Sequence, residues 1–200
     1  MKTPAILACI AALATLGACA SPTPARHMTL DDGRPPAVRS SMTPGVVVVR
    51  ANVPDLIDRP QLVLRSDGNR VALSEQYRWA EPLRREIPRL VAKDLGELLD
   101  SRRVAAMPAD AAGFDVDFKL ALEFQQLDAV IGKGVDVDVL WRLEHRSGNT
   151  IVGRSSFRQP LEDMAATHAA PVAILVAAQR QALRRVAAEI AKEIAAFPKP

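Results

Sequence analysis

The chain has 200 residues, of which 48% are hydrophobic and 24% are charged, with a formal net charge of +3. This length supports one domain with a hydrophobic core and gives little ground for a second. The small positive surplus forms no basic stripe along the sequence, so we expect no nucleic-acid partner.

The N-terminus has the layout of a cleaved signal peptide. Lys2 precedes an apolar run at residues 5–14, which is shorter than the roughly 20 residues of a membrane-spanning helix. The next residues, Leu16-Gly17-Ala18-Cys19, resemble the lipobox of bacterial lipoproteins. We therefore expect residues 1–18 to be removed and the Cys19 thiol to be lipidated. The alternative is an ordinary secretory signal that contains a cysteine.

Residues 19–25 are predicted to form a lipidated tether, in which Pro22 and Pro24 favour an extended backbone. At about 3 Å per residue it reaches roughly 20 Å, so the domain would stay close to the bilayer. Residue 20 is alanine rather than aspartate. In this it resembles the lipoproteins that proteobacteria sort to the outer membrane. The expected location is therefore the periplasmic face of the outer membrane, with the acyl anchor in its lipid.

The first half of the remaining chain is predicted to form two short strands and a β-hairpin. Residues 26–30 fit a first strand, and the valine run at 46–49 fits a central strand that is buried on both faces. Residues 61–65 and 70–73 flank a turn-forming tetrapeptide, which predicts a β-hairpin.

A helix is predicted from Pro82 to about Ser101. Pro82 suits the first helical position, and apolar residues follow at helical spacing. Pro88 lies inside this pattern and is expected to kink the helix or delay its regular start. The apolar face is expected to pack on a sheet.

Strict alternation predicts two further strands. Residues 114–125 alternate apolar with polar, and residues 135–143 repeat the pattern up to a turn at 146–148. The following segment, 151–157, would then return in a hairpin. Its expected register pairs Leu143 with Ile151, Trp141 with Gly153, Val137 with Phe157, and Asp136 with Arg158.

A second long amphipathic helix is predicted from about His168 to Ala196. Its apolar stripe consists of Leu175, Leu183, Val186, Ile190 and Ile194. Together these elements predict an α+β fold: a mostly antiparallel sheet with two long amphipathic helices packed on it.

The sequence gives no pattern for catalysis, a metal or a cofactor. His27, His145 and His168 stand apart from one another, and Ser40-Ser41 and Ser155-Ser156 lack the glycine-elbow context of a hydrolase nucleophile. Gly132-Lys133-Gly134 lacks the earlier glycine of a phosphate loop and is interpreted as a turn between strands. Asp115, Asp117, Asp136 and Asp138 alternate with core residues, so a solvated sheet face is favoured over paired catalytic acids.

Two motifs resemble those of a known family. Residues 54–61 read Pro-Asp-Leu-Ile-Asp-Arg-Pro-Gln, and residues 79–83 read Trp-Ala-Glu-Pro-Leu. They resemble elements of the auxiliary lipoproteins of ABC-type transport systems, the PqiC-like group, and the resemblance covers most of the chain, with the domain placed at 26–200. It implies a non-catalytic component of an MCE/ABC-type intermembrane lipid transport system, without a cofactor.

The partners that the resemblance implies are an MCE-domain protein and, through it, an inner-membrane ABC permease and ATPase. Further copies of the chain are another candidate partner. The alternative is an envelope assembly or structural lipoprotein that binds an outer-membrane protein.

The predicted partner contacts are Arg59, Arg65, Arg70 and Trp79. Arginine is favoured because its planar fork binds carboxylates and phosphates. The same residues also have a structural interpretation: salt bridges to acidic neighbours for the arginines, and a ring buried beside the helix start for Trp79.

Overall fold

A computed structural model describes residues 24–38, 44–108, 113–161 and 171–198. The predicted signal peptide, Cys19, most of the predicted tether, Ser40-Ser41 and His168 therefore lie outside the described residues. The described elements are β1 (Arg26–Met28), β2 (Val46–Asn52), β3 (Gln61–Asp67), β4 (Arg70–Trp79), α2 (Leu83–Leu98), β5 (Val104–Ala106), β6 (Phe118–Val130), β7 (Gly134–His145), β8 (Thr150–Gln159) and α3 (Pro171–Ala196).

The eight strands form one mixed sheet, and the prediction of a mostly antiparallel sheet is wrong. The pairs β1–β4, β2–β5, β2–β6 and β3–β6 run parallel, whereas β3–β4, β6–β7 and β7–β8 run antiparallel. The parallel pairs join strands that are far apart in sequence, with α2 in the crossover between β2 and β6. Periodicity reveals hairpins because their turns are local, but it does not reveal which distant strands become neighbours.

Strand β2 lies inside the sheet, between β5 and β6. Val46, Val47 and Val48 are all buried, and Val49 is half-buried. Because successive side chains of a strand point to opposite faces, burial of three in a row requires cover on both faces. The prediction of a doubly buried strand at this position is confirmed.

The long hairpin β7–β8 has the register that the sequence predicts. Leu143 pairs with Ile151, Trp141 with Gly153, Val137 with Phe157, and Asp136 with Arg158. The β3–β4 hairpin is also confirmed, although β4 continues beyond Leu73 to Trp79.

Strand β6 begins later than alternation alone predicts. It starts at Phe118 rather than Phe114. The segment before Phe118 does not pair as a strand and instead passes over the backbone of Gly45. The backbone N–H groups of Asp117 and Phe118 both donate to the Gly45 carbonyl, and a side chain at Gly45 would meet the Asp115 carbonyl oxygen at 2.1 Å. From Phe118 to Phe124 the buried and wetter faces alternate as predicted.

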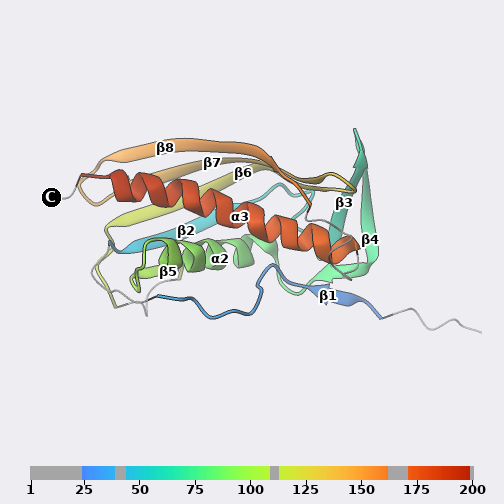
Figure 1. Ribbon diagram of the computed structural model, residues 1–200, viewed down its shortest axis with the longest axis horizontal. Coiled ribbons are helices and arrows are strands. Elements are labelled where there is room, and N and C mark those ends of the chain that lie inside the picture. Colours follow the sequence, from blue (N-terminus) through green and yellow to red (C-terminus); the bar gives the residue numbers. More distant parts are fainter. Residues whose placement is uncertain (1–23, 39–43, 109–112, 162–170, 199–200) are drawn as a thin grey trace, which may run out of the picture.

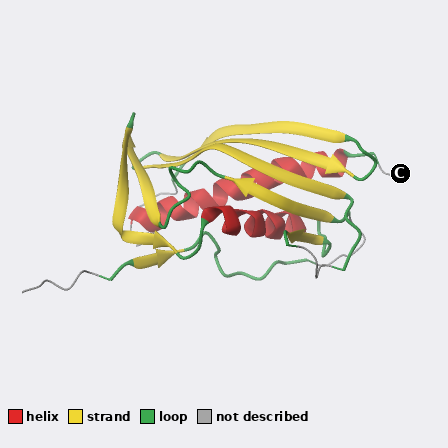
Figure 2. Ribbon diagram, turned by 180° about the vertical axis from the view of Figure 1, so that it is seen from behind, coloured by secondary structure: helices red, strands yellow, loops and turns green. Residues whose placement is uncertain are grey.

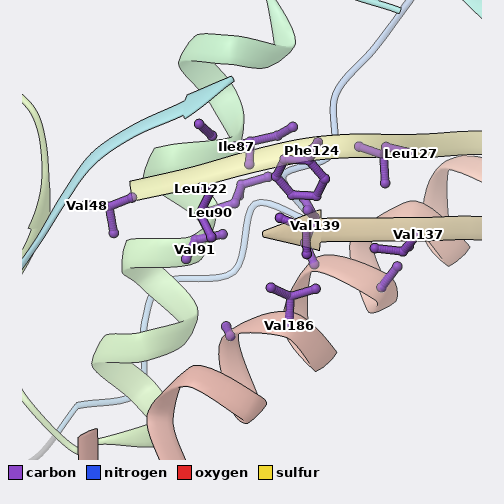
Figure 3. Packing of buried hydrophobic residues seen from close by; sticks show 14 of the residues in the cluster. Val48, Ile87, Leu90, Val91, Leu122, Phe124, Leu127, Val137, Val139 and Val186 are labelled. Carbon is purple, nitrogen blue, oxygen red and sulfur yellow. The ribbon is translucent and has the colours of Figure 1, made fainter. Parts of the chain in front are cut away.

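Both helices cover the same face of the sheet, as Figures 1 and 2 show from opposite sides. Helix α2 begins one residue later than predicted, with Pro82 as its N-cap, and Pro88 lies within it. The core between the helices and the strands is shown in Figure 3, where Leu90 and Val91 of α2 and Val186 of α3 lie close to Leu122 and Val139. The predicted stripe of α3 is buried throughout.

The β3–β4 hairpin runs across the direction of β6, β7 and β8 at one end of the domain, and β1 lies beside its base (Figure 1). The C-terminal end of α3 lies at the opposite end of the molecule. The chain therefore enters the domain at the hairpin end.

Candidate functional site

The two sequence motifs meet in space at the base of the β3–β4 hairpin. The Trp79 N–H donates to the Pro60 carbonyl over 2.7 Å, and Gln61 pairs with Arg78. Strand β1 joins from the other side, where His27 is the register partner of Arg78 and the Ala80 N–H donates to the Met28 carbonyl over 2.8 Å. We call residues 54–61 and 77–83 the motif junction.

A tight turn forms the first half of the motif junction. The N–H groups of Ile57 and Asp58 both donate to the Pro54 carbonyl, at 2.9 and 3.1 Å, and the Ile57 side chain is buried in the core. The turn places Asp58 Oδ2 2.6 Å from Arg84 Nη1 at the start of α2. The turn and the helix start are thus held together by an ion pair.

Trp79 serves the core rather than the surface. Its side chain is only 6% exposed and belongs to the main hydrophobic cluster. The neighbouring Glu81 forms an ion pair with Arg89 of α2. The structure therefore agrees with the structural interpretation of Trp79 and leaves little of its ring for a partner.

A buried carboxylate fixes the chain just after β1. Glu86 is fully buried, and its Oε1 accepts hydrogen bonds from the Leu30 N–H (2.8 Å), the Asp31 N–H (3.2 Å) and the Thr29 hydroxyl. The sequence analysis missed this contact. The available signal was the position of Glu86 on the apolar stripe of the helix, between Leu83 and Leu90.

Lys93 adds a second link between α2 and the same segment. Its Nζ lies 2.9 Å from Asp31 Oδ1 and 3.2 Å from Asp32 Oδ1. The hydrogen bond from Lys93 lowers the pKa of Asp31 below its usual value, although desolvation acts against this shift. Residues 29–32, which we call the N-terminal strap, are therefore fastened to α2 at two places.

Two of the predicted partner-binding arginines are engaged inside the domain. Arg65 Nε donates to Asp128 Oδ2 over 2.8 Å, and Arg65 Nη1 donates to the Gly68 carbonyl. Arg70 forms a two-point ion pair with Asp67 at the tip of the hairpin, where its side chain is 80% exposed. The guanidinium groups of Arg65 and Arg70 therefore already make hydrogen bonds within the domain, which leaves fewer of their N–H donors for a partner.

Arg59 differs from both, and so does Arg78, which the sequence analysis did not select. Each is half-buried, and each has a buried Nε that makes no hydrogen bond within the described residues. Leaving a buried donor without a partner costs about 1 to 3 kcal/mol, and more for a charged group. The two residues lie in adjacent stretches of backbone, and neither guanidinium forms an ion pair with an acidic side chain of the described residues.

The remaining sequence candidates have structural roles. His145 packs between Phe118 and Phe197, and the described residues contain no group of three His, Cys, Asp or Glu side chains that could hold a metal ion. On the sheet, Asp136 pairs with Arg158 and Asp138 pairs with Arg154. The hydrogen bond from Arg158 lowers the pKa of Asp136, so this acid stays charged in an ion pair.

Neither helix in the described part of the chain is long and apolar enough to cross a membrane.

Gly132-Lys133-Gly134 connects β6 to β7, with the Lys133 N–H donating to the Val130 carbonyl over 3.1 Å. This segment is the predicted turn.

Comparison with known proteins identifies the domain. A family model described as "ABC-type transport auxiliary lipoprotein component" matches residues 29–191. No curated protein matches the chain. Among solved structures, an uncharacterized protein is similar over 86% of this chain and 99% of its own, with a TM-score of 0.61 and 16% identity. A protein from Xanthomonas campestris is similar over 85% of this chain and 90% of its own, with a TM-score of 0.58 and 18% identity. At these identities the structures show a shared fold.

Proposed function

The chain belongs to the family of ABC-type transport auxiliary lipoprotein components, and from this premise we propose a specific role for it. It is a non-catalytic periplasmic component of an MCE/ABC-type intermembrane lipid transport system, and it docks the transport machinery at the outer membrane. Its partners are an MCE-domain protein and, through it, an inner-membrane ABC permease and ATPase.

The observation that carries the proposal is the extent of the family match. It begins at the N-terminal strap and ends within α3, and so includes all of α2, most of α3 and all of the strands β2 to β8. The motif junction lies wholly inside it. The resemblance therefore concerns most of the folded domain and not one short motif.

The physical basis of docking is local concentration. Acyl chains on Cys19 fix the domain near one bilayer, and a partner anchored in the other bilayer then meets it at high effective concentration. Modest contact affinity is sufficient under these conditions. The energy of ATP hydrolysis is supplied by the partner ATPase.

The test is affinity isolation of the full-length chain, tagged at its C-terminus, from detergent-solubilised native membranes. We expect an MCE-domain protein, the permease and the ATPase to be recovered with it. Cys19→Ala should abolish both outer-membrane fractionation and this recovery, whereas Cys9→Ala, which changes the other cysteine within the predicted leader, should leave both unchanged.

Recovery of an outer-membrane protein alone, without an MCE-domain protein, would contradict the proposal. It would favour the envelope assembly or structural role instead. Equal recovery from the Cys19→Ala and Cys9→Ala variants would contradict the anchoring mechanism.

A further inference from the structure

We propose that Arg59 and Arg78 form a binding site for the phosphate groups of phospholipids at the end of the domain that faces its own membrane. This inference deepens the proposed function and rests on its premise that Cys19 anchors the domain in a bilayer. It assigns a ligand class to the motif junction.

The position of β1 brings the site close to the bilayer. Only residues 20–25 separate Cys19 from β1, and His27 of β1 is the register partner of Arg78. A stretch of this length spans roughly 20 Å when extended. The first described residues and the base of the β3–β4 hairpin lie at the same end of the domain (Figure 1).

The backbone brings the two arginines to neighbouring positions. The hydrogen bond from the Trp79 N–H to the Pro60 carbonyl joins the residue after Arg78 to the residue after Arg59. Neither side chain has a hydrogen bond or an ion pair with any other described residue, and in each only Nε is fully enclosed. The Nη nitrogens are therefore the atoms open to a ligand, whereas the enclosed Nε atoms are not.

The nearby carboxylates do not neutralise this pair of arginines. Asp58 binds Arg84 through Oδ2, while its buried Oδ1 makes no hydrogen bond within the described residues; Glu81 binds Arg89, with 2.9 Å between Glu81 Oε2 and Arg89 Nη1. The guanidinium fork matches the geometry of a phosphate and binds it through two parallel hydrogen bonds. A phosphate at this position would accept hydrogen bonds from the accessible Nη groups.

A lipid phosphate fits this position better than an acidic peptide, because the tether holds the site within reach of one particular source of phosphate at all times. Negatively charged lipids also attract arginine near a membrane surface through their surface potential. The ligand class that the site fits is therefore the phosphodiester of an anionic phospholipid.

The test measures lipid binding by the mature acylated chain in detergent, using native mass spectrometry and a titration with dioleoylphosphatidylglycerol. We compare the native chain with the double variant Arg59→Gln and Arg78→Gln. Arg70→Gln is the matched control, because Arg70 lies on the same hairpin but pairs with Asp67. A hydrogen bond to a charged group corresponds to about a tenfold change in affinity, so the double variant should bind at least tenfold more weakly.

Normal binding by Arg70→Gln together with weak binding by the double variant supports the site. Equal binding by all three chains would overturn it. Stronger binding of inorganic phosphate alone, or of an acidic peptide, than of the lipid would also overturn the assignment to phospholipid. The double variant should unfold at a temperature no lower than that of the native chain, because the substitutions remove no ion pair.

The same double variant separates this inference from the proposed function. If it still recovers the MCE-domain protein but loses lipid, the lipid site and the transport role are both supported. If the native chain binds lipid through these arginines but recovers no MCE-domain protein, the lipid site is supported and the transport role fails.

Discussion

At the scale of single residues, Gly153 is a position where the β7–β8 hairpin leaves no room for a side chain. A Cβ at this position would lie 2.0 Å from Cζ2 of Trp141, whose indole N–H donates to the Ser155 hydroxyl over 3.3 Å. Gly153→Ala should therefore displace the ring and destabilise the fold by about 1 to 3 kcal/mol, as measured by urea unfolding. Val152→Ala, at an exposed neighbour, is the control and should change stability by less than about 0.5 kcal/mol. Equal stability of both variants would show that Trp141 can repack.

The candidate site was predictable from the sequence only in part. The two motifs lie together in the fold, and Arg59 remains a candidate, but Arg65, Arg70 and Trp79 are engaged within the domain. Residue type alone cannot show which arginine finds an internal acid. Arg78 was missed because its lack of a partner depends on how β1, β3 and β4 meet.

At the scale of elements, the two helices are joined by one largely buried ion pair. Arg180 of α3 binds Asp94 of α2 at two points, both 2.5 Å, and the Asp94 side chain is fully buried. Burial alone would lower the pKa of Arg180, but the hydrogen bonds and charge of Asp94 raise it above its usual value.

Asp94→Asn should destabilise the domain by about 3 to 5 kcal/mol in urea unfolding, because it leaves the Arg180 charge buried without a counterion. Arg154→Gln is the comparison, since it breaks the exposed pair with Asp138 and should hardly shift the unfolding midpoint. A small effect of Asp94→Asn would mean that water reaches the Arg180 guanidinium.

The N-terminal strap predicts a pH-dependent contribution to stability. Because the folded-state pKa of Asp31 is lowered, mainly by Lys93, its contribution is present above the unfolded-state pKa of about 4 and is lost as pH falls through the folded-state pKa. Asp31→Asn should lower the unfolding midpoint at neutral pH, and the difference from the native chain should shrink below about pH 4. Thermal unfolding across this range measures it. Asp55→Asn is the control, because Asp55 is exposed and has no ion pair in the described residues, and it should follow the native curve. A difference in unfolding midpoint between Asp31→Asn and the native chain that does not change with pH would contradict the account.

The elements themselves were largely predictable, whereas the sheet order was not. Alternation fixes which face of β7 is buried, and a short turn then fixes the register of β8, as the pairing of Leu143 with Ile151 confirms. No local pattern encodes the parallel pairing of β2 with β6, because the β3–β4 hairpin, α2 and β5 all lie between the two strands in sequence. Their pairing is a long-range contact that exists only in the folded molecule.

At the scale of the whole molecule, the domain is asymmetric along its length. The chain enters beside the motif junction, and α3 ends at the far side (Figure 1). An anchored domain of this kind would place Arg59 and Arg78 toward its own bilayer and leave the far end for a partner that approaches across the periplasm.

This arrangement depends on the fate of Cys19, so the most direct test is the intact mass of the native protein extracted from membranes. The account predicts a chain that begins at Cys19 and carries the added mass of a diacylglycerol and a further acyl chain. A chain that retains residues 1–18, or one that begins elsewhere and bears an unmodified cysteine, would contradict it.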